Sequence, residues 1–142
     1  MTHGIARVAL LACTLGVTAA CGPDELPLPP TSLETGIVIY EHANFIGASA
    51  HITEDIPDLR DYDGPCRHDS ATGPGLTLNW NDCLSSVRVA PGWSATLYRD
   101  DNYRDDSLTI SEDVPNLQLV DHDCPNQGLN DCVTSIRVRR LF

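Results

Sequence analysis

The chain contains an internal repeat, and neither copy is long enough to enclose a hydrophobic core alone. Two blocks recur at an offset of 58 residues, and a third recurs at 49 because the first copy carries nine extra residues. The paired blocks are 40–45 with 98–103, 52–59 with 110–117, and 78–89 with 129–138. Small units of this kind bury their apolar faces against each other. The copies, 36–90 and 94–142, are therefore predicted to form one domain over 36–142.

Apolar residues alternate with charged ones along several segments of this domain. Val87 and Val89 flank Arg88, and the same alternation returns at 136–139. A period of two is typical of strands with one buried face. Further β-branched or aromatic runs, bounded by turn residues, lie at 36–40, 95–98 and 108–110. About eight short strands in two copies predict an all-β fold, a β-sandwich built from two Greek-key motifs.

The N-terminal segment has the composition of an export signal. Residues 1–20 carry one charge, at Arg7, ahead of an apolar core and a stretch of small residues that ends before Cys21. This pattern predicts a signal peptide at 1–20, and the apolar core is shorter than the ~18 residues of a membrane span. The segment also resembles a bacterial lipoprotein signal, which implies acylation of Cys21 and a proline-rich tether over 21–35. An ordinary signal peptide cut nearby, with Cys21 as an incidental thiol, is the alternative.

The chain is strongly acidic. It has 9 Lys+Arg against 20 Asp+Glu, a formal net charge of -11 and a pI near 4.5. Nucleic-acid binding needs clustered basic residues, so this class of partner is excluded. Only 20% of the residues are charged, which is a globular composition rather than that of a disordered acidic tail. We expect an exported monomer that is lipid-anchored in the cell envelope, at an outer membrane or the cell surface, or is secreted.

Four cysteines lie within the repeated domain. Each copy holds one cysteine at each of two aligned positions, so we expect Cys66 to pair with Cys83 and Cys124 with Cys132. A crossed pairing between the copies is the alternative. A zinc site is disfavoured because the sequence has no CxxC and no histidine pair at ligand spacing. The cysteines therefore predict disulfides in an oxidising compartment.

An aromatic hairpin followed by a polar six-residue loop occurs once in each copy. The two copies have Tyr40-x4-Phe45-x-Gly47 with NDCLSS at 81–86, and Tyr98-x4-Tyr103 with NDCVTS at 130–135. This arrangement resembles the βγ-crystallin domain, a family that pairs two Greek keys, each with such a hairpin and an (Asn/Asp)-(Asn/Asp)-x-x-(Ser/Thr)-Ser loop. The resemblance covers 36–142. It also implies a left-handed backbone at Asp105, which stands where the first copy has the hairpin glycine.

The same resemblance implies calcium binding, because microbial members of the family commonly bind two Ca2+ ions per domain, each shared between the motifs. Side-chain ligands are then expected from Asn81, Asp82, Ser85, Asn130, Asp131 and Thr134, and backbone carbonyl ligands from Glu41, Cys83, Arg99 and Cys132. Ca2+ takes six to eight oxygen ligands of these kinds. Few carboxylates per ion predict a modest affinity, about 10 µM to 1 mM. A disulfide at the third loop position either preorganises each loop or holds it away from the ion.

Two functions of different classes follow. The first is an exported, lipid-anchored, Ca2+-binding domain with a structural or stress-protective role in the cell envelope, whose partners are Ca2+ and a membrane. The alternative is a proteinase inhibitor, since some exported bacterial proteins of this fold resemble metalloprotease inhibitors that use a rigid, disulfide-held loop. The candidate loop lies between Cys66 and Cys83, where the first copy has its insertion. No catalytic motif is present, and we expect no enzyme.

Overall fold

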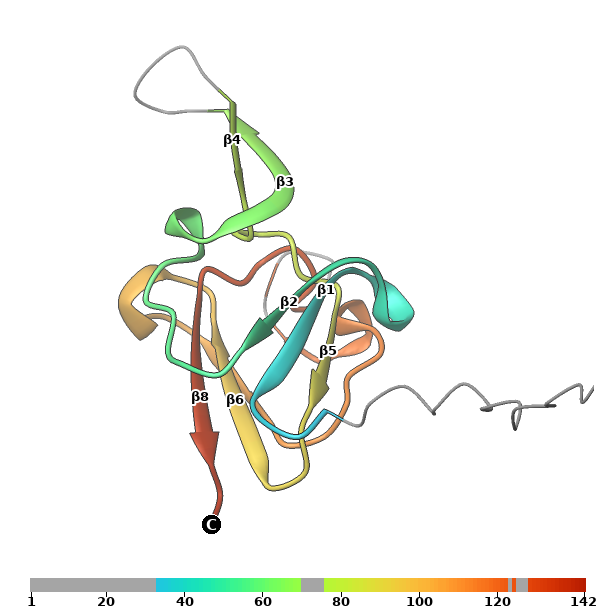
Figure 1. Cartoon of the computed structure of the whole chain (residues 1–142). Coiled ribbons are helices and arrows are strands. Elements are labelled where there is room, and N and C mark those ends of the chain that lie inside the picture. Colours follow the sequence, from blue (N-terminus) through green and yellow to red (C-terminus); the bar gives the residue numbers. More distant parts are fainter. Residues whose placement is uncertain (1–32, 70–75, 123, 125–127) are drawn as a thin grey trace, which may run out of the picture. The chain divides into compact units, whose positions relative to one another are not determined.

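The computed structural model describes residues 33–69, 76–122, 124 and 128–142, which form eight strands joined by short 3-10 helices (Figure 1). The strands are β1 (Ile37–His42), β2 (Ile46–Ile52), β3 (Asp63–Asp69), β4 (Leu76–Asn79), β5 (Ser86–Val89), β6 (Trp93–Tyr98), β7 (Ser107–Ile110) and β8 (Ser135–Arg140). The 3-10 helices are η1 (Ala43–Phe45), η2 (Leu59–Asp61), η3 (Asp101–Tyr103) and η4 (Leu117–Leu119). The predicted signal peptide, Cys21 and most of the tether lie outside the described residues. Within the described part, none of the helices has the length and apolar character needed to span a bilayer.

Each copy of the repeat builds one three-stranded antiparallel sheet. The order is β2-β1-β5 in the first copy and β7-β6-β8 in the second. The first strand of each copy is central, with the second strand on one side and the last strand on the other. The last strand thus returns to lie beside the first, as it does in a Greek key.

In each copy, the segment after the second strand pairs with the sheet of the other copy. Ile56 exchanges two backbone hydrogen bonds with Ile136 of β8, at 2.8 and 2.9 Å. Val114 does the same with Val87 of β5, at 2.9 and 2.8 Å. Each sheet is therefore completed by a segment of the other copy. This exchange confirms the predicted sandwich of two Greek keys, and it explains physically why the two copies form one domain.

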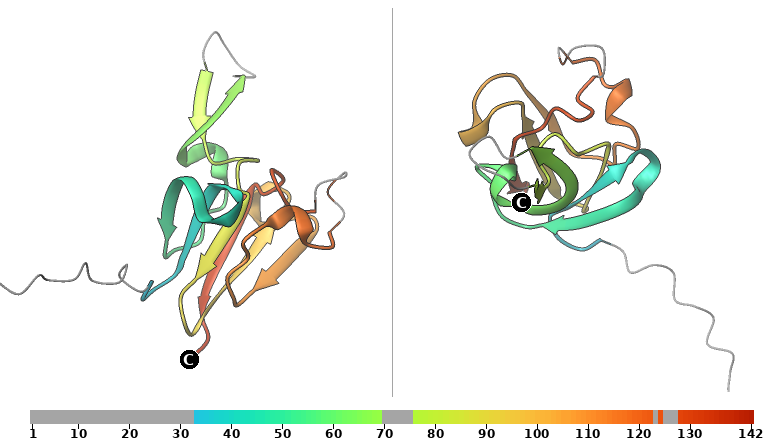
Figure 2. Two further views of the ribbon diagram at one scale, coloured as in Figure 1. Left: turned by 90° about the vertical axis from the view of Figure 1, so that its right-hand side faces the viewer. Right: turned by 90° about the horizontal axis from the view of Figure 1, so that it is seen from above.

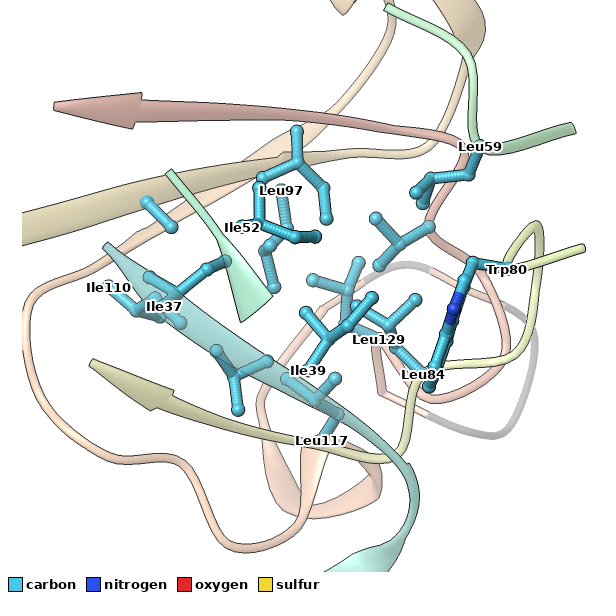
Figure 3. Close-up of a cluster of buried hydrophobic side chains, with 14 of the residues drawn as sticks. Ile37, Ile39, Ile52, Leu59, Trp80, Leu84, Leu97, Ile110, Leu117 and Leu129 are labelled. Atoms are coloured by element: carbon cyan, nitrogen blue, oxygen red, sulfur yellow. The ribbon is translucent and has the colours of Figure 1, made fainter. Parts of the chain in front are cut away.

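The hydrophobic core lies between the two sheets. Its fully buried side chains come from both copies, among them Ile37 and Ile39 of β1, Leu97 of β6 and Ile136 of β8 (Figure 3). Along β1 the buried residues alternate with partly exposed ones, as the period-two pattern predicts. Trp80, which is 2% exposed, lies beside Leu84 at one end of this cluster (Figure 3).

The two aromatic hairpins have the same shape. Tyr40 packs edge-on against Phe45 with ring centroids 5.7 Å apart, and the matching pair of the second copy is 5.8 Å apart. Gly47 has a φ of +85°, and Asp105 has a φ of +62°. The expected left-handed backbone at Asp105 is thus confirmed. Asp tolerates this conformation better than most residues, because its short side chain can bond to nearby backbone.

The insertion in the first copy forms a β-hairpin rather than the loop that the sequence suggested. Strands β3 and β4 pair only with each other, from Asp69 opposite Leu76 to Cys66 opposite Asn79. Figures 1 and 2 show this hairpin extending from one end of the sandwich. We call β3 and β4 the arm. An insertion that leaves the sheets must satisfy its own backbone groups, and strand pairing does this. Residues 70–75 of the insertion lie outside the described residues.

Candidate metal centre

The two predicted ion loops, 81–86 and 130–135, lie against each other. Asp82 N–H donates to the Val133 carbonyl at 3.1 Å, and Asp131 N–H donates to the Leu84 carbonyl at 3.0 Å. Asp82 has a φ of +44° and Asp131 a φ of +51°, a turn conformation in both loops. The backbone therefore crosses the two loops, and each aspartate lies beside the loop of the other copy.

Each loop is also joined to the aromatic hairpin of its own copy. Ser85 N–H donates to the Tyr40 carbonyl at 3.0 Å, next to Glu41. Thr134 N–H donates to the Tyr98 carbonyl at 2.9 Å, next to Arg99. Ser85 therefore lies near Glu41, and Thr134 lies near Arg99. In each copy, the residue with the predicted hydroxyl ligand is close to the residue with the predicted carbonyl ligand.

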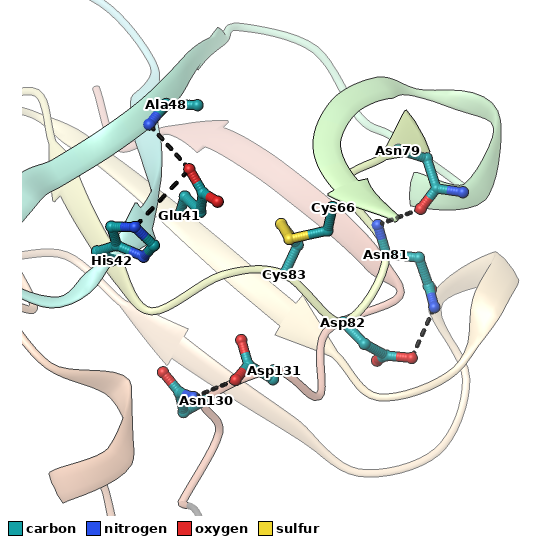
Figure 4. The surroundings of a disulfide bond; sticks show 10 residues. All are labelled: Glu41, His42, Ala48, Cys66, Asn79, Asn81, Asp82, Cys83, Asn130 and Asp131. Carbon is teal, nitrogen blue, oxygen red and sulfur yellow. Dashed lines mark hydrogen bonds and ion pairs between the residues drawn. A yellow bond between two sulfur atoms is a disulfide. The ribbon is translucent and has the colours of Figure 1, made fainter. Parts of the chain in front are cut away.

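One cleft of about 590 Å³ is lined by five of the residues predicted as metal ligands, and Figure 4 shows all of these except Ser85. These are Glu41, Asp82, Cys83, Ser85 and Asp131. Glu41 comes from β1, Asp131 from the loop of the second copy, and the other three from the loop of the first copy. The arm supplies a further wall of the cleft through Arg67 and His68. The remaining predicted residues are Asn81 and Asn130, which flank the aspartates, and Arg99, Cys132 and Thr134 of the second copy.

The two aspartates of the crossed loops are partly desolvated, and the charge of Asp131 acts on Asp82. Desolvation by the surrounding loop raises the pKa of the Asp131 carboxyl above its usual value, although Asn130 donates to it at 2.6 Å. Desolvation likewise raises the pKa of Asp82 and outweighs the lowering effects of the Asn81 hydrogen bond and the His68 charge, while the charge of Asp131 adds a smaller raising effect. Among the described residues, neither carboxylate forms a salt bridge. A bound cation would stabilise the ionised form of both carboxylates.

Asn81 supplies an unused oxygen beside these carboxylates. Its side-chain nitrogen donates to Asp82 Oδ2 at 2.6 Å, and this bond fixes the orientation of the amide. The amide oxygen Oδ1 is buried and accepts no hydrogen bond from the residues that the structure describes. A buried acceptor without a donor is destabilising unless a cation or a water takes it. Carboxylate, amide, hydroxyl and carbonyl oxygens are the donors that suit Ca2+, so the residues present fit this ion.

Among the described residues, no group of three or more His, Cys, Asp and Glu side chains is arranged so that these side chains alone could hold a metal ion. A site at the crossed loops would therefore depend on backbone carbonyls, amides and hydroxyls beside one or two carboxylates. This is the composition of a modest-affinity calcium site.

The aromatic hairpin of the second copy has a basic neighbour, Arg60. The matching position beside the first hairpin is occupied by the neutral Gln118. The Arg60 guanidinium donates to Asp58 at 2.8 Å and also to the Asp101 carboxylate. Its positive charge acts on Asp82 as well, with a small lowering effect on the pKa of that carboxyl. The sequence analysis missed Arg60, since its pairing with Asp101 spans 41 residues and no local pattern marks it.

The last serine of each loop has a structural role that the sequence analysis also missed. Ser86 Oγ donates to the His42 carbonyl at 2.7 Å and accepts from Phe45 N–H at 3.0 Å. Ser135 makes the same two bonds to the second hairpin, at 2.6 and 3.1 Å. Both serines are fully buried. Their recurrence at the sixth loop position was the signal that could have identified them.

Both disulfides lie at the loops. Cys66 of β3 is joined to Cys83 with Cα atoms 5.9 Å apart, and Cys124 is joined to Cys132 with Cα atoms 6.4 Å apart. The pairs lie within each copy, not across copies. Cys83 is 1% exposed and lies at the foot of the arm, so the covalent link connects the arm to the first ion loop.

Comparison with known proteins identifies the family and the fold. The model of peptidase inhibitor family I36 matches residues 39–111, just over half of the chain. Spherulin-3A of Physarum polycephalum is 29% identical over 102 residues, which are 72% of this chain and 80% of that protein. A βγ-crystallin domain from Flavobacterium johnsoniae is 32% identical with a TM-score of 0.51, covering 73% of this chain and 93% of that one. A structure concerned with the evolution of the eye-lens βγ-crystallin fold is 27% identical with a TM-score of 0.53, covering 75% and 87%. The chain therefore belongs to peptidase inhibitor family I36, and its fold is that of a βγ-crystallin domain.

Proposed function

We propose that this protein is an exported domain that binds Ca2+ at its crossed loops and has a structural role in the cell envelope. The observation that carries the proposal is the pair of partly desolvated carboxylates, Asp82 and Asp131, which lie in one cleft without a cationic partner among the described residues. The orphaned Oδ1 of Asn81 adds a third oxygen beside them. A divalent cation would relieve the repulsion between these groups and satisfy the free acceptor.

The ligands fall into two crossed sets. Asp131 lies near the first hairpin, since the charge of His42 acts on its pKa. It would therefore share an ion with Ser85 and with the carbonyls of Glu41 and Cys83. Asp82 would share the other ion with Thr134 and with the carbonyls of Arg99 and Cys132, while Asn81 and Asn130 support their neighbours. Ca2+ would supply charge neutralisation and a link between the copies.

Bound Ca2+ would stabilise the folded domain. A ligand that binds only the folded state stabilises it by RT ln(1 + [L]/Kd), which is about 1.4 kcal/mol at a tenfold excess and about 2.7 kcal/mol at a hundredfold excess. An exported protein encounters Ca2+ at such concentrations when the affinity is modest. Acylation of Cys21 would hold the domain at a membrane through the tether.

The test is a calorimetric Ca2+ titration of the oxidised mature chain with Cys21→Ser, beginning from chelator-stripped protein. We expect two binding events, with dissociation constants of about 10 µM to 1 mM, and a melting temperature that rises with Ca2+. Folded protein that gives no heat and an unchanged melting curve in millimolar Ca2+ would contradict the proposal.

Peptidase inhibition is the second candidate, and the family match favours it. The matched residues 39–111 include the whole arm. The arm stands apart from both sheets, is anchored by a disulfide, and exposes Leu78 to 54%. A rigid, protruding hairpin is suited to enter a peptidase active site at low entropic cost.

This candidate is tested by inhibition of a panel of secreted metalloproteases with micromolar protein. Leu78→Asp on the arm should abolish inhibition. The matched control is Leu119→Asp, a change at a more exposed leucine in the second copy, which should leave inhibition unchanged. If no protease of the panel is inhibited, or if both variants inhibit equally, the arm is not the inhibitory element.

A further inference from the structure

In the first copy, the arm and the ion loop are joined covalently. Cys83 is the third residue of the loop 81–86, and its partner Cys66 lies in β3. A change in the backbone at Cys83 is therefore transmitted directly to the arm.

Backbone contacts tighten the same connection. Trp80 N–H donates to the Tyr62 carbonyl at 3.0 Å, and Asn81 N–H donates to Asn79 Oδ1 at 3.0 Å. Gly64 lies so close to Asn79 that a Cβ atom at Gly64 would be 2.5 Å from the Asn79 carbonyl carbon. β3 thus begins, and β4 ends, in close contact with the residues that lead into the loop. Close-packed segments of this kind move together rather than independently.

The arm also forms one wall of the cleft that holds the aspartates. Arg67 and His68 of β3 line this cleft together with Asp82 and Asp131. Among the described residues, the buried Nε2 of His68 has no hydrogen-bond partner, so this group does not fasten the arm to the loops. Ordering of the loops by an ion would therefore act next to side chains of the arm.

The second copy has no equivalent. Cys132 occupies the matching loop position, but it is joined to Cys124, only 8 residues earlier in the sequence. The described residues between them, 128–131, form no strand. Among the described residues, a disulfide between an ion loop and a hairpin outside the sheets therefore occurs in the first copy alone.

We infer that Ca2+ binding at the crossed loops and the position of the arm are coupled through the Cys66–Cys83 disulfide, so that Ca2+ fixes the arm and tightens its binding to a peptidase. This inference rests on both functions proposed above. Coupling between two sites is reciprocal, so a peptidase that takes the arm raises the affinity for Ca2+ by the same factor. The two functions then belong to one regulated unit.

Hydrogen exchange of the β3 and β4 amides, with and without saturating Ca2+, tests the coupling in the mature chain. We expect exchange in the arm to slow by at least about fivefold, the lower end of ordinary coupling between sites. The variant C66S/C83S should lose this effect, and the matched variant C124S/C132S should keep it. Equal slowing in both variants would overturn the role of the Cys66–Cys83 disulfide.

Calorimetry on the same samples separates this inference from the functions beneath it. Heat of Ca2+ binding without slower exchange in the arm overturns the coupling and leaves the calcium site standing. No heat overturns the calcium site and the coupling together. The wild-type measurement is decisive even if C66S/C83S does not fold. For any protease that the protein inhibits, the inhibition constant should fall by about fivefold in Ca2+ relative to chelator, and an unchanged constant would contradict regulation of the arm.

Discussion

The two copies of the repeat share their backbone contacts and differ in the side chains around them. Each copy contributes one segment to the other's sheet, crosses one loop with the other's loop, and fastens its hairpin with a buried serine at the sixth loop position. Among the described residues, an arm occurs in the first copy and not in the second. The backbone framework is therefore sufficient for the fold, and the departures from symmetry indicate where function has been added.

Several single-residue differences alter the charge or strain of one copy, and three of them are compared first. Gly47 in the first hairpin corresponds to Asp105 in the second, Arg60 corresponds to Gln118, and Arg139 corresponds to Ala90. Arg60 brings a positive charge near one aspartate of the crossed loops but not the other. We therefore expect the two ion sites to have unequal affinities, with the tighter site at Asp131.

The disulfides give the largest expected effect on stability. Loop-closure entropy assigns about 3 kcal/mol to the Cys66–Cys83 bond, with a separation of 17 residues, and about 2.5 kcal/mol to Cys124–Cys132, with a separation of 8. Chemical denaturation of C66S/C83S and C124S/C132S should show losses in this order. A larger loss in C124S/C132S would mean that the foot of the arm does not add to the stability of the domain.

Asp131→Asn should remove the tighter calcium site. Loss of an outer-shell partner already lowers metal affinity 10- to 100-fold, so loss of a ligating carboxylate should cost about a hundredfold or more. Asp82→Asn should remove the weaker event instead. Glu112→Gln, an exposed change away from the loops, is the matched control. If Asp131→Asn titrates like wild type, Asp131 is not a ligand.

The same variant should make the calcium-free protein slightly more stable. The pKa of Asp131 is raised in the folded state, so its ionised form opposes folding at neutral pH, and the opposition disappears as the pH falls below that pKa. Asn removes the charge and accepts the left-handed backbone at this position. Melting in chelator at pH 7 and at pH 4 measures the effect, and the gain should be smaller at pH 4.

Exchanging the residues at the hairpin position tests the strain at Asp105. Gly47→Asp should cost about 1–2 kcal/mol, because φ is +85° there and an added Cβ would lie 2.9 Å from the His42 ring. Asp105→Gly should stabilise by about 0.5–1 kcal/mol, since relief of the left-handed strain outweighs the entropy of glycine. Denaturant unfolding of both variants measures the changes. A destabilised Asp105→Gly would show that the Asp105 carboxylate contributes a favourable interaction.

Asp55 and Asp113 occupy matching positions but have different partners. Each accepts a backbone N–H from a strand, and Asp55 also accepts two bonds from Arg139, at 2.7 and 3.0 Å. Partial burial raises the pKa of Asp55, but the bonds from Arg139 and Val138 lower it by more. Its stabilisation is therefore present above the usual carboxyl pKa and lost as the pH falls through the lowered value. Asp55→Asn should cost up to about 1 kcal/mol at pH 7, and Asp113→Asn less. Equal losses would mean that the Arg139 pair contributes nothing.

The fold could be predicted because the repeat and the period-two pattern depend on local sequence. The pairing of each copy with the sheet of the other could not be predicted. It consists of single-residue bridges at Ile56 and Val114, which are too short to give a periodic pattern in the sequence. The arm was missed because its strands pair with each other instead of with the core, so β3 lacks an alternating apolar face. Of the site residues, five meet in one cleft because the loop motif fixes them by backbone bonds. The role of Arg60 could not be predicted, because its ion pair with Asp101 forms only when the chain is folded.

Arg60→Gln gives the smallest expected effect and the most direct test of the inequality between the sites. The substitution introduces the residue that the second copy has at the matching position, and it removes a positive charge whose field reaches Asp82. Repulsion between one charge and a divalent ion across a solvated surface is weak, so the affinity of the weaker site should rise only about two- to fivefold at low salt and less at high salt. The reverse change, Gln118→Arg, should weaken the tighter site by a similar factor. Calorimetric titrations of both variants at two salt concentrations measure these shifts. If Arg60→Gln leaves both affinities unchanged, the charge of Arg60 is not the origin of any inequality between the two sites, and the exchange of Glu41 for Arg99 beside the loops is the next difference to test.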